Sequence, residues 1–213
     1  MELKIKYRPD IDGLRAIAVL SVVFYHAGIK TFSGGFVGVD VFFVISGFLI
    51  TKIIIQEVYS GQFSLTNFYE RRIRRIFPAL FTTIVLTTAI STYLFDPNVF
   101  FEFSKSLIAT TFFTSNVLFW TETGYFDAPS YLKPLLHTWS LAVEEQFYIF
   151  FPLLILIIFR FFKNKLKLTL IVTAVLSFIL SAYFVQKEPS TAFYLAPLRA
   201  WELLIGSILA VNI

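Results

Sequence analysis

Arg15 and His26 are ionisable residues in the first apolar segment of the chain, where contact with lipid would penalise both side chains. They are eleven residues apart, which on an α-helix is three turns plus roughly 20°, so both fall on one stripe about 16 Å apart along the axis. Residues aligned in this way usually serve an internal path or site. The alternative is snorkelling, with the two side chains reaching opposite interfaces. We favour an internal site because Asp40 and Ser46 repeat the pattern in the next apolar segment.

His26 and Asp40 have the chemistry of a general base and its carboxylate partner. An imidazole can take a proton from a hydroxyl group near neutral pH, and a carboxylate can orient the ring and stabilise its charged form. The connector around residues 30–35 is short, so we expect two antiparallel helices with these residues at similar depth. The alternative is a polar pair that only packs the two helices together.

A second polar cluster, around His137, Glu144 and Glu145, opens the apolar run at 142–162. The spacing from the histidine to the first glutamate matches no standard zinc pattern, so we expect no metal site. Two adjacent glutamates entering an apolar run cannot both face lipid, and at least one should face an internal cavity. The alternative is a helix N-terminus whose acidic residues complement the helix dipole.

Arg72 and Arg75 belong to a basic run at 71–75. They are three positions apart and share one face of a helix, and arginine suits bidentate recognition of phosphate. A cytosolic donor that carries phosphate groups could therefore dock there. The alternative is that the run anchors the chain by the positive-inside rule or binds lipid headgroups.

The composition identifies an integral membrane protein. Apolar residues make up 57% of the chain and charged residues 15%, and the mean hydropathy is +0.74. The chain contains no cysteine and two histidines, which excludes disulfides and thiolate metal sites. The formal charge of +4 comes from clusters beside apolar runs, and it indicates membrane topology rather than a nucleic-acid partner.

The apolar runs predict an all-α transmembrane bundle in one domain. A span needs about 20 apolar residues, and five complete spans are expected near 12–30, 35–55, 77–95, 142–162 and 167–185. A sixth begins near residue 199 and reaches the end of the chain. The stretch 103–120 contains polar residues and is predicted to be re-entrant or interfacial.

The basic clusters predict which side each loop occupies. The rule that basic loops are cytoplasmic places the N-terminus inside. It places three clusters on that same side if 103–120 does not fully span: Lys4, Lys6 and Arg8; the run at 71–75; and Arg160, Lys163, Lys165 and Lys167. The segment 96–141 is then external.

This orientation divides the polar residues into two sites. The outer side would hold His26 and Asp40, with a supporting cluster of Ser46, His137, Glu144 and Glu145. The inner side would hold Arg15, Arg72 and Arg75. An outer imidazole and carboxylate site would thus be separate from an inner basic site.

Four blocks of sequence resemble the acyltransferase-3 family of bacterial membrane O-acyltransferases. They are residues 7–19, 34–51, 68–78 and 137–148, in the order that the family has them. The Arg-x10-His motif of the family falls on Arg15 and His26, and its Arg-x-x-Arg motif falls on Arg72 and Arg75. Blocks one and two most resemble members with an additional C-terminal extracytoplasmic domain.

The resemblance implies transfer of an acyl group, usually acetyl, from cytosolic acyl-CoA to an extracytoplasmic acceptor. Typical acceptors are sugars of lipopolysaccharide, peptidoglycan or other surface glycans, and the expected location is the bacterial inner membrane. Acyl-CoA would be a co-substrate, with no permanently bound cofactor. The family also implies a longer helical bundle than these 213 residues provide, so we expect a fragment or a truncated gene product.

The sequence therefore predicts a membrane O-acyltransferase with His26 as the base and Asp40 as its possible partner. Arg15, Arg72 and Arg75 would hold the CoA phosphates or line the passage of the acyl group. The alternative of a different class is a transporter or exporter whose polar residues line a substrate path. An inverted repeat would favour the transporter, and none is visible.

Overall fold

Helices form the regular secondary structure of residues 8–123, 129–162 and 165–211, the residues that the computed structural model describes, and no strand occurs in these ranges. The helices are α1 (Pro9–His26), α2 (Gly38–Tyr59), α3 (Leu65–Leu94), α4 (Pro97–Thr111), α5 (Ser115–Thr121), α6 (Thr138–Phe161), α7 (Leu166–Lys187), α8 (Pro189–Tyr194) and α9 (Ala196–Val211), with short 3-10 turns η1 (Lys30–Phe32), η2 (Gly35–Val37) and η3 (Ser130–Leu132). Lys4, Lys6 and Lys163, which entered the topology prediction, lie outside the described residues.

Four segments of the described chain are long and apolar enough to cross a membrane. They are Gly35–Tyr59, Leu65–Leu94, Thr138–Phe161 and Leu166–Lys187. Helix α1 has 18 residues but carries three charged side chains, Asp10, Asp12 and Arg15, and α9 has 16 residues. The protein is a multi-pass membrane protein, and the predicted all-α bundle is confirmed.

Two helix boundaries differ from the sequence-based estimate and affect the site. Helix α1 ends at His26, and the chain then turns through Gly28 at φ 75°, a backbone conformation that favours glycine. Helix α3 begins at Leu65, capped by the Ser64 hydroxyl, which accepts a hydrogen bond from the backbone N–H of Asn67. The basic run at 71–75 is therefore inside α3, where its residues have fixed helical faces.

The stretch predicted to be re-entrant or interfacial does not form one continuous helix. Helices α4 and α5 are separated by Phe113, whose φ of 54° is left-handed. Gln146 of α6 holds the break, since its side-chain Nε2 donates to the carbonyl of Phe113 and to the amide oxygen of Asn116, both at 2.8 Å. Neither α4, with 15 residues, nor α5, with seven, reaches the length of a span. The depth of this stretch in the membrane stays a prediction.

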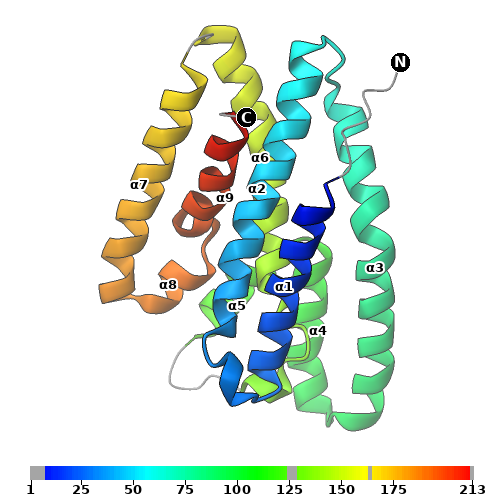
Figure 1. Ribbon diagram of the computed structural model, residues 1–213. Helices are drawn as coiled ribbons and strands as arrows, with labels where there is room; N and C mark the ends of the chain where they lie inside the picture. Colours follow the sequence, from blue (N-terminus) through cyan, green and yellow to red (C-terminus); the bar gives the residue numbers. More distant parts are fainter. Residues whose placement is uncertain (1–7, 124–128, 163–164, 212–213) are drawn as a thin grey trace.

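The two ends of the helical bundle differ in which helices begin and finish there (Figure 1). The N-terminal end is where α1, α3 and α7 begin. The other end, called the histidine end below, is where α1 finishes at His26 and α6 starts after His137. The arginines near the start of α3 and the basic residues around the α6–α7 connection both belong to the N-terminal end. These basic segments therefore share one end of the bundle, and the side of the membrane that this end occupies stays a prediction.

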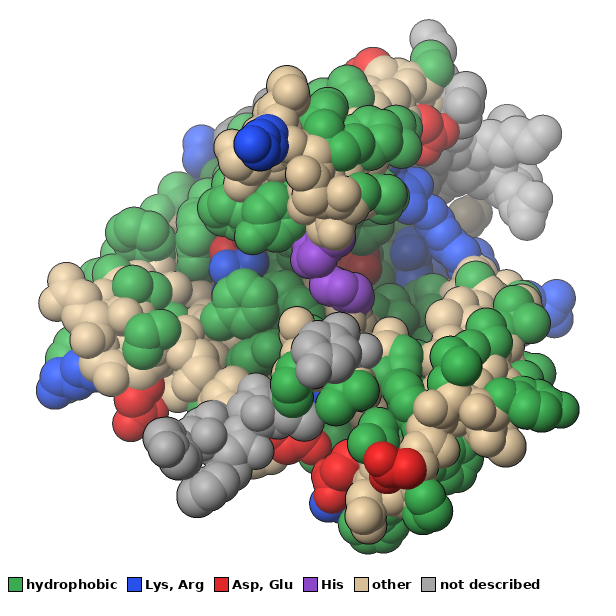
Figure 2. Space-filling model, turned by 90° about the horizontal axis from the view of Figure 1, so that it is seen from below, with side chains coloured by type: hydrophobic (Ala, Val, Ile, Leu, Met, Phe, Trp, Pro, Cys, Tyr) green, Lys and Arg blue, Asp and Glu red, His purple; other side chains and the backbone are tan. Residues whose placement is uncertain are grey.

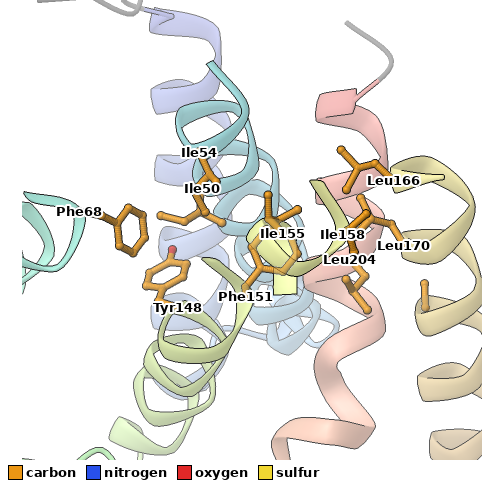
Figure 3. Packing of buried hydrophobic residues seen from close by; sticks show 11 residues of the cluster. Ile50, Ile54, Phe68, Tyr148, Phe151, Ile155, Ile158, Leu166, Leu170 and Leu204 are labelled. Atoms are coloured by element: carbon orange, nitrogen blue, oxygen red, sulfur yellow. The ribbon is translucent and has the colours of Figure 1, made fainter. Parts of the chain in front are cut away.

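The core brings α2 into direct contact with α6 and α9. Ile50 and Ile54 of α2 pack with Phe151 and Ile155 of α6 in a cluster that also includes Phe68, Tyr148, Ile158, Leu166, Leu170, Ala174 and Leu204 (Figure 3). Helices α2 and α9 approach closely at two glycines. A Cβ atom placed on Gly47 would lie 1.8 Å from the Leu203 carbonyl oxygen, and one on Gly206 would lie 1.9 Å from that of Val44.

Candidate active site

A cavity of about 500 Å³ lies between α1, α2, α3 and the beginning of α6. This volume is in the range of small-molecule sites. Its polar lining consists of Arg15, Ser46, Arg72, Arg75, His137, Thr83, Thr138, Glu144, Glu145 and Tyr148, and its apolar lining includes Phe42, Leu49, Leu80 and Leu141. From His137 to Tyr148 the cavity follows eleven residues of chain, about 16 Å of helix.

Glu144 is the centre of a buried hydrogen-bond network in the cavity wall. Its Oε1 accepts hydrogen bonds from the Ser46 hydroxyl and, at 2.5 Å, from the Tyr148 hydroxyl. Glutamate and tyrosine are four residues apart on α6 and so lie on one face of the helix, while the serine comes from α2. The network fixes the orientation of one carboxylate and two hydroxyl groups and joins α2 to α6.

Glu145 differs from its neighbour because its carboxylate is not fully satisfied. Its side chain lines the cavity, the residue is 8% exposed, and Oε1 has no hydrogen-bond partner among the described residues. A buried carboxylate oxygen without a partner is costly. The prediction that at least one glutamate of this pair faces a cavity is confirmed, and both do.

The arginines of α3 divide into two kinds. Arg71 pairs with Glu57 at 2.7 Å and Arg74 with Glu70 at 2.7 Å. Arg72 and Arg75 instead line the cavity, and neither has a carboxylate within ion-pair distance in the described part of the chain.

The guanidinium of Arg72 lies over two aromatic rings, 5.2 Å from the centroid of Tyr148 and 5.8 Å from that of Phe68. Arg15 enters the same cavity from α1. Its guanidinium lies 5.5 Å from the centroid of the Phe42 ring, and its NH1 is 3.6 Å from the Asp12 carboxylate. Three guanidinium groups thus converge on one space, as an anion site requires.

The two histidines of the chain meet at the histidine end of the bundle. The ring centroids of His26 and His137 are 4.5 Å apart, with the rings nearly perpendicular. In the view from this end the two side chains lie side by side, next to a hollow that contains basic side chains (Figure 2). The Nδ1 atom of His26 is 2.9 Å from the carbonyl oxygen of Val22, which can only accept a hydrogen bond. Nδ1 therefore carries the proton, and Nε2 is the free basic atom of the neutral ring.

The predicted pairing of His26 with Asp40 is wrong. Asp40 forms an ion pair with Arg199 at 2.5 Å, and Arg199 also lies 3.2 Å from Glu202. The imidazole of His26 makes its contacts with the Val22 carbonyl and with the rings of Tyr25 and His137. The short connector around residues 30–35 predicted similar depth for His26 and Asp40, but it did not reveal that α9 packs against α2 and supplies the competing cation.

The predicted separation into an outer and an inner site is also wrong. Arg15, Arg72 and Arg75 line the same cavity as Ser46, His137, Glu144 and Glu145. Long arginine side chains and the early start of α3 bring the basic residues into this space. Sequence reasoning did not assign a role to Tyr148 or Arg199. A charged residue within an apolar run is the signal that could have indicated Arg199.

Comparison with known proteins identifies the family of the chain. The sequence profile of the acyltransferase-3 family, which describes an acyltransferase domain, matches residues 8–212. The chain belongs to the acyltransferase-3 family. The residues on which the sequence analysis placed the two motifs lie on α1, for Arg15 and His26, and on α3, for the cavity-lining Arg72 and Arg75.

Several curated proteins are similar to almost the whole chain. O-acetyltransferase OatA of Staphylococcus aureus (strain NCTC 8325 / PS 47) is 39% identical over 210 residues, which cover 96% of this chain and 34% of the relative. Peptidoglycan O-acetyltransferase OatA of Listeria monocytogenes is 40% identical over 213 residues, with coverage of 96% and 34%. A putative O-acetyltransferase of Staphylococcus aureus (strain MSSA476) is 37% identical over 215 residues, covering 97% and 35%. The chain spans about a third of the length of these relatives. No solved structure matches it.

Proposed function

We propose that this chain provides the acyl-transfer site of a membrane O-acetyltransferase, which moves an acetyl group from acetyl-CoA to a hydroxyl group of an extracytoplasmic glycan. The observation that carries the proposal is one cavity lined by three arginines and by His137, whose ring contacts the ring of His26. The donor phosphates need cationic groups and the acceptor hydroxyl needs a base. The cavity supplies both kinds of group within about 16 Å of helix.

The arginines form the donor part of the site. Arg72 and Arg75 can bind phosphate oxygens without first breaking an ion pair within the protein, and Arg15 adds a third guanidinium. The apolar wall formed by residues such as Phe42, Leu49 and Leu80 suits the uncharged arm that carries the acyl group. Arg71 and Arg74 have carboxylate partners outside the cavity. We assign these two residues the role of anchoring the chain by the positive-inside rule.

His26 supplies the base. Its Nε2 can take the proton from the acceptor hydroxyl, and the hydroxyl oxygen then attacks the thioester carbonyl. The carbon–sulfur bond breaks, the acetyl group is left as an ester on the acceptor, and the thiolate of CoA takes up a proton. The hydrogen bond from Nδ1 to the Val22 carbonyl fixes the tautomer that this step needs.

The acceptor is a glycan of the cell surface. The Listeria relative is named as a peptidoglycan O-acetyltransferase, which favours a peptidoglycan sugar over lipopolysaccharide. The basic residues near the N-terminal end favour a cytoplasmic location for that end in a bacterial inner membrane. The histidine end, with its imidazole pair, would then face the acceptor outside.

The test uses the full-length protein in lipid nanodiscs, which leave both faces open to solution. Acetyl-CoA labelled in its acetyl group is supplied with a chito-oligosaccharide of N-acetylglucosamine as the acceptor. We expect base-labile label on the sugar, with loss of that label in the Arg72→Ala, Arg75→Ala double variant. Intact wild-type protein that leaves all label on CoA, with this acceptor and with peptidoglycan fragments, would contradict the proposal. Movement of unmodified sugar across sealed vesicles would favour a transporter.

A further inference from the structure

His137 is the imidazole that borders the cavity, whereas His26 contacts the ring of His137. His137 precedes the first residue of α6 and lines the cavity together with Glu144 and the three arginines. His26 is not part of that lining, and its ring lies 4.5 Å from the ring of His137. An acceptor hydroxyl that reaches the cavity from the histidine end would meet His137 first.

We propose that His137 is a second catalytic residue, which contacts the acceptor hydroxyl and shares its proton with His26 as one two-imidazole base. The inference rests on the proposed acetyl transfer and adds a residue to it. The proton leaves the acceptor oxygen as that oxygen bonds to the acetyl carbon, it is held on the imidazole pair, and it ends on the sulfur of the departing CoA. Transfer therefore neither consumes nor releases a proton overall.

The electrostatics of the pair suit this role. Packing around the ring lowers the pKa of His137 below its ordinary value although part of its surface is open, and the charge of His26 lowers it further. Two imidazoles at this distance do not both readily take up a second proton and become positively charged, so one ring stays neutral and available as a base. The other charged groups of the cavity are Arg15 from α1, Arg72 and Arg75 from α3, and Glu144 and Glu145 from α6.

The experiment must separate proton chemistry from ring packing. His137→Phe keeps an aromatic ring against His26 but removes the nitrogen lone pair, and His137→Gln removes the ring. Tyr25→Leu is the matched control, because the Tyr25 ring also contacts His26 edge-on, with centroids 5.0 Å apart, and lies outside the cavity lining. Each variant is assayed by transfer of labelled acetyl groups in nanodiscs, with kcat and the KM for acetyl-CoA measured separately.

Both His137 variants should lower kcat by about 10²–10⁴-fold, the range for loss of a general base, with the KM for acetyl-CoA unchanged. Tyr25→Leu should stay near the wild-type rate. His26→Gln combined with His137→Gln should be no slower than the slower single variant, since residues that act as a unit are not additive. A kcat near wild type in His137→Phe would overturn the proposal while leaving the acetyl transfer itself established. Absence of transfer in the wild type would instead reject the proposed function.

The pH profile gives a readout that a purely structural role would not change. Removing His26 removes the positive charge that lowers the pKa of His137, so that pKa rises. A base must be neutral, and the acid limb of kcat/KM, which reports the free enzyme, should therefore move to higher pH in the residual activity of His26→Gln. An acid limb that keeps its position, or moves to lower pH, would show that His137 is not the titrating base.

Discussion

Asp40 and Arg199 are 159 positions apart in the sequence and form a 2.5 Å ion pair between the beginnings of α2 and α9. Gly47 and Gly206, at which the backbones of these helices approach each other closely, each follow seven positions later. The two pairs therefore lie on the same helix faces, one above the other. An electrostatic contact and a close backbone contact together fix how α9 lies against α2, the helix that carries Ser46.

Replacing Arg199 should destabilise the protein more than replacing Asp40. The arginine side chain is 14% exposed and serves both Asp40 and Glu202, whose own side chain is 2% exposed. Arg199→Met removes the cation from both carboxylates, and its loss at the buried Glu202 side chain should cost about 3–5 kcal/mol. Asp40→Asn keeps the contact with Glu202 and should cost less. Thermal unfolding in nanodiscs measures both, and equal losses would show that Glu202 does not depend on this arginine.

Gly47→Ala and Gly206→Ala should each separate α2 from α9. The added methyl groups would lie 1.8 Å and 1.9 Å from backbone carbonyl oxygens, which cannot move aside as a flexible side chain can. Gly13→Ala in α1 is the matched control, because its Cβ would meet nothing within 4 Å and alanine favours a helix by about 0.5–1 kcal/mol. We expect lower melting temperatures for the first two variants and no loss for the third. An unchanged melting temperature in Gly47→Ala would contradict the close approach.

The residues predicted from the sequence and those missed differ in a physical way. Arg72 and Arg75 were identified because their spacing is a property of one helix. The separate inner site was not correct, because the reach of an arginine side chain into a neighbouring cavity is not encoded in hydropathy. The pairing of Asp40 depends on α9, where the apolar run near the end of the chain indicated only part of a span. Contacts between helices distant in sequence therefore remained unknown until the fold was available.

Glu144→Leu should destabilise the protein, whereas Glu144→Gln should retain its fold. Leucine leaves the hydroxyls of Ser46 and Tyr148 buried without the acceptor that both now use, at about 1–3 kcal/mol for each unsatisfied group. Glutamine still offers one oxygen at the same place. Melting temperatures of the two variants provide the measurement, with Ser46→Ala in the Glu144→Leu background as a check. That added change should cost little, because the serine has already lost its partner.

Cysteine labelling tests the membrane orientation directly, since the chain has no cysteine of its own. Ile73→Cys near the N-terminal end and Ile29→Cys near the histidine end are placed at exposed positions. An impermeant thiol reagent applied to intact cells should label position 29 and leave position 73 unlabelled until the cells are opened. Strong labelling of position 73 in intact cells would reverse the proposed orientation, and with it the assignment of the donor to the cytoplasmic side.

Replacing Arg72 and Arg75 by lysine should weaken acetyl-CoA use even though the positive charge is kept. Lysine loses the planar fork that holds phosphate oxygens in pairs, and hydrogen bonds to charged groups contribute about 1.5–3 kcal/mol each. The KM for acetyl-CoA should rise markedly, with a smaller change in the KM for the sugar acceptor. The matched control is the Arg71→Lys, Arg74→Lys variant, which makes the same charge-conserving replacement on the same turns of α3 but at positions that pair with Glu57 and Glu70. If both double variants show wild-type KM values for acetyl-CoA, the arginines of α3 act as topological anchors, and the donor site must then be centred on Arg15.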